Sequence, residues 1–506
     1  MKLVPFPANT QTNSPYEPKS VLEIHRSTSP PVSSTTTTAG EILTVCDDDP
    51  DLQLQLEDDH ELMINQHQYL VGWDSLMRDL GLHDDSETQI TTPSQLISTI
   101  PHQSQPVTSF DSNHFMPSDF SSILSDIPLN NNSDAINSFD VGFDYVDDLV
   151  RLADSFDTNS FQLGPVILAQ LNQRLTSPTG KPLRRATFYF KEALRSLRPD
   201  STRPSHYPTN NSSEIIQTIK AHKTFSDISP IPMFASFTAN QAVLDALDGS
   251  MHVHVIDFDI GLGGHWASFM KELAHKADFG GAAPPVLRIS AIVREGYATE
   301  SRLIRDNLTQ FGCELNIRFE IDFVLLRTFE YLSFKAIKFV DGAKLALLLS
   351  PAIFRHVGTG FLNDLRQLSP HVVVHMDVEG QTGLATRPTT SYRLAVIDGL
   401  EFYSALLESL EAANDSNNSG DWMRGIERFV VFPKIVEAVG RQGPPCREAL
   451  VAAGLRQVGL GRFAEFQAEC LVRRVQVRGF HVVKRQGEML LCWHDRPLVA
   501  TSAWTY

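Results

Sequence analysis

The sequence is poor in cysteine. Five cysteines occur in 506 residues, an odd number, and no two of them form a C-x-x-C pair. Thiols so few and so scattered indicate neither a disulfide framework nor a zinc site. We therefore expect free thiols in a reducing compartment and no metal centre.

Long apolar runs and catalytic signatures are also missing. No stretch of about 18 or more apolar residues occurs, so no membrane-spanning helix is expected. The first residues, MKLVPFPANT, lack the apolar run of a secretory signal. The patterns G-x-S-x-G, H-E-x-x-H and G-x-x-x-x-G-K-[ST], which mark hydrolases, zinc proteases and P-loop enzymes, do not occur. The sequence predicts a protein that is not an enzyme.

Positive charge is scarce in the amino-terminal part of the chain. Residues 1–143 contain 21 acidic and four basic residues, which accounts for the whole net charge of −17. The remaining 363 residues contain 39 of each sign. A histone-like, polybasic mode of nucleic-acid binding is excluded for the whole chain, because no net positive field attracts phosphate. We predict an acidic arm, 1–143, joined to an electrically balanced body, 144–506.

The arm is rich in Ser, Thr, Pro, Asn, Gln and Asp, and we predict that it is mostly disordered. Such a composition buries too little apolar area to offset the entropy of ordering the backbone. One segment, 70–85, differs, because its apolar residues recur at helical offsets 0, 3, 4 and 7. The segment either folds into a groove of a partner protein or docks on the body of its own chain. The candidate partner-binding residues are Trp73, Leu76, Met77 and Leu80.

The body is predicted to be an α/β domain with a helical beginning. Residues 144–212 form a helical cap and a Pro/Ser/Asn-rich connector, and 213–506 form an α/β core. Near-continuous apolar strands that alternate with helices are typical of a Rossmann-like, doubly wound sheet. From Leu471 to Trp504 the pattern indicates an antiparallel meander, with one turn at Gln486-Gly487 and another at 494–497. This combination is typical of the fold of S-adenosylmethionine-dependent methyltransferases. A fold alone does not establish a function.

A glycine-rich turn follows the first predicted strand. A loop that binds a nucleotide or S-adenosylmethionine needs such glycines, and also an acid near the end of the next strand to bind a ribose. Glu295 is the only acid near that second position. Trp266 and Phe269 are expected to crowd the pocket. The turn consists of Asp259, Gly261, Gly263 and Gly264.

The substrate side of a methyltransferase is not recognisable. The strand HVVVHMDV ends in Asp377-Val378-Glu379-Gly380, without the Asn/Asp-Pro-Pro-aromatic run that orients a target amine. We interpret the turn as a degenerate site without a cofactor, and a methyltransferase as a remote alternative. His252 and His254 share one side of a strand, where they could bind a metal, but packing or polar contacts are favoured.

The ordered motifs of the body resemble those of the GRAS domain, a regulatory module of plants. TANQA at 238–242 precedes a Val-His-Val-Ile-Asp core, and leucine-rich blocks predicted to be helical, at about 146–197 and 296–350, flank that core. Segments 256–261 and 73–78 are most similar to the HAIRY MERISTEM and SCARECROW-like 15 branch. The matching residues are Val253, His254, Val255, Ile256, Asp257, Phe402, Tyr403, Arg447, Glu448, Trp493, Ser502, Ala503 and Trp504.

The sequence departs from the family pattern near its carboxyl-terminal motif. Cys446 stands before Arg447 where Trp is usual, and Thr505-Tyr506 follow the last Trp where a basic residue is common. The resemblance implies a nuclear transcriptional regulator that works through protein contacts. It suggests DNA-bound partners, including WUSCHEL-type homeodomain proteins, roles in meristem or shoot development, and dimers through the GRAS domain.

Direct DNA binding remains an alternative. Basic residues gather in two parts of the body, and a neutral domain can still carry a basic face. Exposed arginines on amphipathic helices are, however, usually only solvated. The candidate DNA contacts are Arg184, Arg185, Arg473, Arg474 and Arg478.

Overall fold

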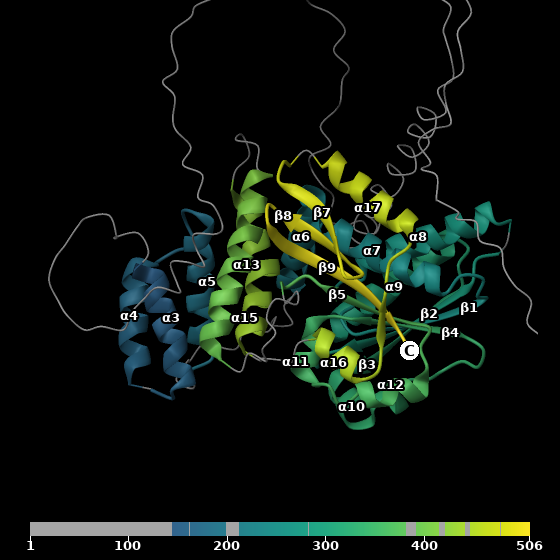
Figure 1. Ribbon diagram of the computed structural model, residues 1–506, viewed down its shortest axis with the longest axis horizontal. Helices are drawn as coiled ribbons and strands as arrows, with labels where there is room; N and C mark the ends of the chain where they lie inside the picture. Colours follow the sequence, from purple (N-terminus) through teal and green to yellow (C-terminus); the bar gives the residue numbers. More distant parts are fainter. Residues whose placement is uncertain are drawn as a thin grey trace, which may run out of the picture. The chain divides into compact units, whose positions relative to one another are not determined.

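The computed structural model describes most of the body of the chain (Figure 1). Trp73, Leu76, Met77 and Leu80 of the predicted partner-binding segment lie outside the described residues. Within the described part, none of the helices is both long and apolar enough to cross a bilayer. The described residues are 144–160, 162–198, 212–281, 283–380, 391–413, 420–440, 446–475 and 477–506.

One mixed sheet organises the described part of the chain. Its order is β3-β2-β1-β4-β5-β9-β8-β7, and the short β6 also pairs with β9. The five strands from β3 to β5 are parallel, and the carboxyl-terminal strands are antiparallel. The predicted doubly wound α/β sheet with an antiparallel meander is therefore confirmed. The strands are β1 (His252–Asp257), β2 (Val286–Val293), β3 (Phe319–Leu325), β4 (Lys344–Leu349), β5 (Val372–Asp377), β6 (Arg456–Val458), β7 (Phe480–Arg485), β8 (Glu488–Trp493) and β9 (Arg496–Thr505).

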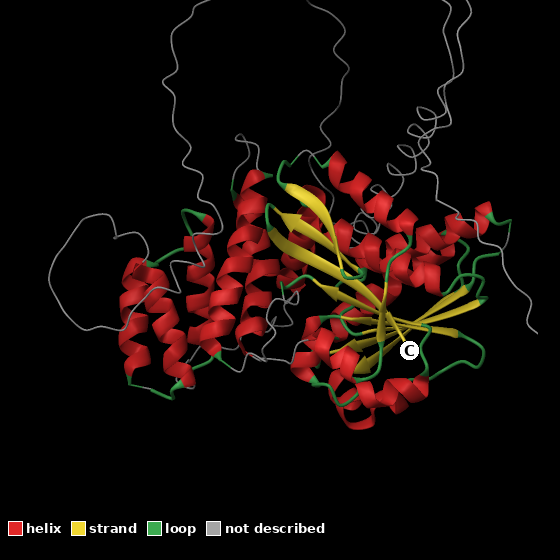
Figure 2. Cartoon of the chain, viewed as in Figure 1, coloured by secondary structure: helices red, strands yellow, loops and turns green. Residues whose placement is uncertain are grey.

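Helices cover both faces of the parallel strands, as Figure 2 shows. Side chains alternate along each strand, so Val255 packs under one layer of helices and Ile256 under the other. The first layer contains α7 (Pro230–Ala246), α8 (Gly264–Phe279) and α9 (Ala298–Glu314). The second contains α10 (Leu326–Leu332), the 3-10 helix η1 (Ser333–Ala336), α11 (Pro351–His356), α12 (Leu362–Leu368) and α16 (Cys446–Ala452).

The cap is a bundle made from two distant parts of the chain. In Figure 1, α3 and α5 lie beside α13, α5 also lies beside α15, and α4 packs on the outer side of α3; α13 and α15 follow β5. Arg185 of α5 forms ion pairs with Glu411 of α13 and with Glu427, whose carboxylate also accepts the Tyr189 hydroxyl at 2.9 Å. The bundle contains α3 (Asp144–Asp157), α4 (Leu163–Arg174), α5 (Pro182–Ser196), α6 (Ser212–Ile228), α13 (Tyr392–Ala412), α14 (Asp421–Ile426), the π-helix η2 (Glu427–Val431) and α15 (Phe432–Gly440).

Two of the predicted elements are wrong in part. The meander does not begin at Leu471, because that residue lies in helix α17 (Arg462–Arg474), whose apolar side packs on α7 and β7. The block 296–350 is not helical throughout, because it contains β3 and β4. The predicted turn at Gln486-Gly487 is present, and its two positive φ angles, 50° and 83°, are typical of a two-residue hairpin.

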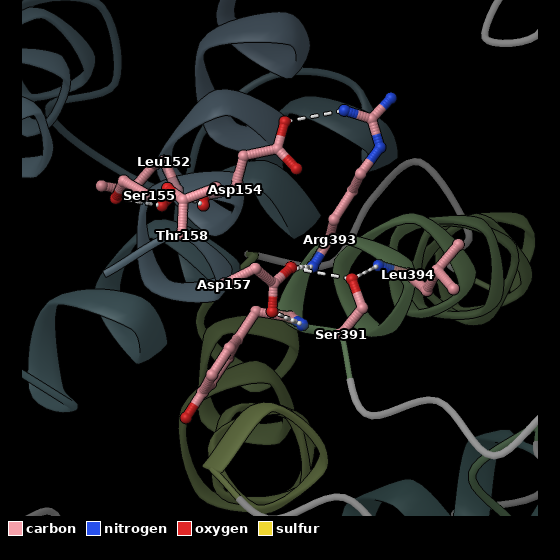
Figure 3. Close-up of polar contacts among 9 residues, drawn as sticks. Leu152, Asp154, Ser155, Asp157, Thr158, Ser391, Arg393 and Leu394 are labelled. Atoms are coloured by element: carbon pink, nitrogen blue, oxygen red, sulfur yellow. Dashed lines mark hydrogen bonds and ion pairs between the residues drawn. The ribbon is translucent and has the colours of Figure 1, made fainter. Parts of the chain in front are cut away.

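Asp157 joins the two parts of the cap (Figure 3). Its Oδ1 accepts the backbone N–H of Tyr392 at 2.8 Å, and its Oδ2 accepts the N–H of Arg393 at 3.0 Å and the hydroxyl of Ser391 at 2.7 Å. One turn earlier, Asp154 accepts the Arg393 guanidinium at 2.7 Å. The end of α3 thus satisfies the first donors of α13, which otherwise have no partner within their own helix.

Asp157→Ala should lower the free energy of unfolding by about 1–2 kcal/mol, because it removes the acceptor of two backbone N–H groups at the start of α13. The measurement is denaturant unfolding of the full chain. Asp144→Ala is the control, since its ion pair with Arg174, at 3.7 Å, is half exposed and should contribute little. Equal effects of the two substitutions would contradict the capping role of Asp157.

Candidate functional site

A cavity of about 610 Å³ opens at the carboxyl ends of the parallel strands. It lies where the strand order reverses between β1 and β4, which is where open α/β sheets bind ligands. Four connections line it, those that follow β1, β2, β3 and β4. The lining residues are Phe258, Asp259, Ile260, Gly261, Ile292, Val293, Arg294, Glu295, Gly296, Tyr297, Glu300, Leu326, Arg327, Glu330, Ala352, Ile353 and His356.

The glycine turn forms one wall of this cavity. Asp259 and Gly261 line it, and a Cβ on Gly261 would meet no atom within 4 Å. Gly263, with φ of 82°, packs against α9, where a Cβ would lie 3.0 Å from Ile304 Cγ2. Gly264 begins helix α8. Gly261 therefore leaves backbone open to a ligand, while Gly263 permits close packing of two elements.

A buried carboxylate holds the turn in place. Asp257, the last residue of β1, accepts the backbone N–H of Asp259 at 2.8 Å and the indole N–H of Trp266 at 2.7 Å. Burial raises the pKa of Asp257 from 3.8 to about 7. The last residue of the Val-His-Val-Ile-Asp motif therefore fixes the path from the strand to the helix.

Trp266 does not crowd the cavity, so that prediction is wrong. Its side chain is fully buried between α8 and the sheet, with its ring 5.4 Å from that of Phe269. The turn directs α8 so that these aromatic side chains face the core. The amphipathic pattern of α8 in the sequence did not predict which face of this helix the glycine turn would place against the sheet.

The cavity contains an acid that the sequence analysis did not identify. Glu300 lies in the first turn of α9, is 6% exposed, and its Oε2 has no hydrogen-bond partner. The predicted acid, Glu295, also lines the cavity but is exposed. Beside them, the hydroxyl of Tyr297 donates to the carbonyl of Gly261 and ties the loop after β2 to the glycine turn.

The strand beside β1 across the switch point is β4 and not β5. A substrate-orienting run was expected at the end of β5, whereas the end of β4 is the one that lies next to the glycine turn. The segment after β4 is Ser350-Pro351-Ala352-Ile353, which has one proline and no aromatic residue in the run. The Asn/Asp-Pro-Pro-aromatic run that orients a target amine therefore follows neither β4 nor β5.

Charged groups at this edge of the sheet mostly hold elements together. Arg355 of α11 pairs with Glu379 after β5 at 2.6 Å, and both side chains are almost completely buried. Glu437 of the cap helix α15 contacts Arg294 and lies 3.8 Å from Arg355 and 3.7 Å from His356. These pairs tie the core to the cap.

Phe402 and Tyr403, the aromatic pair of the family motif, lie on α13 where the cap meets the core. Gly380 packs flat on Phe402, since a Cβ there would lie 2.2 Å from the ring. The Tyr403 ring is 5.8 Å from that of Phe190 in α5, and burial raises the pKa of its hydroxyl well above the usual value. Tyr403 therefore packs two cap helices together, and Phe402 packs α13 on the segment after β5.

The carboxyl-terminal motif residues form a second structural cluster. Arg447 of α16 donates to Glu488 of β8 at 2.9 Å and lies over the ring of Trp504 at 5.8 Å. The Trp504 indole donates to Ser502 at 2.9 Å. Ala503 and Trp493 are buried in the same strands, and Glu448 is exposed.

The TANQA segment connects α7 to the last strand and to α8. The hydroxyls of Thr238 and Thr501 lie 2.7 Å apart, although 263 positions separate them in the sequence. Asn240 and Gln241 donate to Glu272, whose pKa burial raises to about 8. This segment therefore positions helices rather than a ligand.

The two strand histidines do not share an environment. His254 is buried, its Nε2 lies 2.9 Å from Ser290 Oγ, and burial lowers its pKa to about 4. His252, two residues earlier, is exposed. His254 thus makes the polar contact favoured by the sequence.

The candidate DNA contacts do not form one free basic surface. Arg185 is buried and its guanidinium is committed to Glu411 and Glu427. Arg184 donates to backbone carbonyls, among them that of Thr179 at 2.9 Å. Of the second group, Arg473 lies 3.4 Å from Glu469, within α17. Arg474 ends the same helix, and Arg478 is exposed in the turn before β7.

Asp257→Asn should lower the free energy of unfolding by about 1–3 kcal/mol, because the amide group turns a donor toward one of two buried N–H groups. Asp278→Asn, at the far end of α8, is the control. Denaturant unfolding measures both, and a loss confined to Asp257→Asn is expected.

The raised pKa of Asp257 gives a pH dependence of known sign. An acid with a pKa of about 7 when folded and 3.8 when unfolded stabilises the fold fully below pH 3.8. The contribution of Asp257 to stability decreases as the pH rises above 3.8, and it is lost as the pH rises through about 7. Between pH 4 and 7 the wild type should therefore lose more stability than Asp257→Asn, and parallel curves would contradict this.

Comparisons with known proteins agree with the motifs. The family model described as GRAS domain family matches residues 145–505. Scarecrow-like protein 15 of Arabidopsis thaliana is 46% identical over 475 residues, 89% of this chain and 96% of the relative. Scarecrow-like protein 6 of the same plant is 37% identical over 365 residues, 70% of this chain and 62% of the relative.

A solved structure supports the same conclusion for the fold. The crystal structure of SCL7 in Oryza sativa superposes with a TM-score of 0.56 at 22% identity, and the match covers 71% of this chain and 99% of that one. The resemblance inferred from the sequence motifs is confirmed. The chain belongs to the GRAS domain family.

Proposed function

We propose that this protein is a nuclear transcriptional regulator that acts as a scaffold or co-regulator for DNA-bound transcription factors in plant development. The observation that carries the proposal is the match of the GRAS family model to residues 145–505, together with 46% identity to Scarecrow-like protein 15 over most of both chains. Fold alone would not carry it, because one fold hosts many functions.

The chemistry of the cavity agrees with a role other than catalysis. Beside it, charged side chains pair across elements, as Arg355 does with Glu379, and Arg294 of the cavity wall contacts Glu437. The segment after β4, 350–353, lacks the run that would orient a target amine. The family motif residues Asp257, Tyr403 and Trp504 are buried and hold elements together. A role in holding elements together accounts for these motif residues without any reaction.

The arm supplies the recruiting segment in this proposal. Trp73, Leu76, Met77 and Leu80 form an apolar stripe when helical, and the surrounding carboxylates keep the segment solvated until a partner binds. The proposed partners of the body are DNA-bound transcription factors, and specifically WUSCHEL-type homeodomain proteins. The proposed biological role is in meristem or shoot development. A homo- or heterodimer through the GRAS domain is part of the same proposal.

Contact with DNA is proposed to be indirect or weak. Arg185 is buried against two carboxylates, and Lys484, beside the second basic group, lies 3.1 Å from Glu465 and 3.2 Å from Glu469. Acidic side chains that lie among the basic ones in this way offset the positive electrostatic potential that would attract the phosphates of DNA. Binding through partner proteins therefore fits the body better than binding of phosphate.

Removing residues 1–143 should abolish most of the reporter output of the full chain and leave partner capture by residues 144–506 unchanged. A matched variant, Trp73→Ala with Leu76→Ala, should reproduce most of the loss, because it removes the apolar stripe and keeps the charge. Reporter assays and co-precipitation in plant nuclei measure the two readouts. Unchanged output with partner binding intact would refute the role of the arm.

The full chain should show at most weak retention of duplex DNA at low salt, which disappears in a salt series as counterions compete. Adding a DNA-bound homeodomain partner should restore retention at salt concentrations where the chain alone is not retained. Mobility-shift assays measure both. Sequence-specific retention of DNA by the chain alone at physiological salt would overturn the indirect mode.

A further inference from the structure

The cavity at the switch point contains a buried acid without a partner. Glu300 is 6% exposed, it lines the cavity, and its Oε2 makes no hydrogen bond. A buried carboxylate oxygen without a donor costs free energy, so native structures rarely retain one without a reason. The position is therefore suited to a ligand that brings a hydrogen-bond donor.

The glycine turn provides open backbone at the cavity. Gly261 has φ of 53° and faces free space where a Cβ would stand. The hydroxyl of Tyr297 holds the Gly261 carbonyl, so the turn is fixed before a ligand enters. Apolar side chains, including Ile292 and Ile353, also line the cavity. An apolar ring can pack on such side chains while a polar group of the same ligand reaches Glu300.

The charges around the cavity discriminate between ligands. Four carboxylates line it, and of its two arginines Arg294 is already in contact with Glu437. The walls therefore carry an excess of negative charge, which repels phosphates and carboxylates and tolerates neutral molecules. The acids are Asp259, Glu295, Glu300 and Glu330.

We propose that this cavity binds an uncharged nucleoside of the adenosine type, with Glu300 accepting the ribose hydroxyls. A glycine turn after the first strand and an acid near the end of the second are the two features that bind a ribose at such a switch point. Glu300, in the first turn of the helix that follows β2, is the buried acid on that side of the cavity. The volume, about 610 Å³, lies within the range of small-molecule sites. The inference goes beyond the regulatory function, requires no reaction, and makes the protein responsive to a small molecule.

Calorimetry of the full chain with adenosine tests the proposal. Saturable binding is expected, with adenosine 5′-monophosphate weaker because of the acidic walls. Removing both ribose hydroxyls, as in 2′,3′-dideoxyadenosine, should weaken binding about tenfold to a hundredfold, the usual effect of losing hydrogen bonds to a charged group. Adenosine should also raise the thermal midpoint of the chain, since it binds only the folded state.

Glu300→Gln should weaken adenosine binding by a similar factor and remove the discrimination against 2′,3′-dideoxyadenosine. Glu314→Gln, at the other end of the same helix and exposed, is the matched control and should bind as the wild type does. The wild-type comparison of the two nucleosides remains decisive if Glu300→Gln does not fold. Absence of saturable heat and of a thermal shift at millimolar adenosine would overturn the proposal, as would equal binding of the two nucleosides by wild type.

Discussion

The buried carboxylate of Asp257 is the contact on which the rest of the core depends. It joins the end of the first strand to the backbone of the glycine turn and to the indole of Trp266 in the next helix. Because the indole is fixed, α8 presents its aromatic side to the sheet, and the turn can leave Gly261 open at the cavity. A single side chain therefore influences both the packing of one helical layer and the shape of the cavity wall formed by the glycine turn.

Much of the fold could be predicted from local patterns, whereas the long-range arrangement could not. Apolar runs and glycine turns indicated the parallel strands, and Gln486-Gly487 indicated a hairpin that the structure contains. The strand order is not encoded locally, so the substrate side was sought after β5 instead of β4. Glu300 was missed because an acid in the first turn of an amphipathic helix is ordinary in sequence. The joining of α5 to α13 depends on ion pairs such as Arg185 with Glu411, between residues far apart in the chain.

At the carboxyl edge of the sheet, beside the cavity, charged side chains connect the core to the cap. Arg355 and Glu379 are buried as a pair, and Glu437 extends the contact to the cap. Breaking such a pair by removing one partner is costly, while its net contribution to stability is small, so its main effect is to fix one arrangement of core and cap. The relative position of the two is thus set at the rim of the cavity. A molecule in the cavity would lie against the same connections.

The position of strand β9 in the sequence affects how the protein folds during its synthesis on the ribosome. It pairs with β5, β6 and β8 and supplies Thr501 to α7, yet it is synthesised after all the other described elements. Until it emerges, β5 remains an unprotected edge, and an open apolar edge invites association with other chains. Amino-terminal parts generally fold first during translation, so the nascent chain must wait with an incomplete sheet. Messages truncated before β9 should therefore yield products that chaperones and proteases recognise, and premature stop codons even late in the reading frame should act as complete losses of the protein.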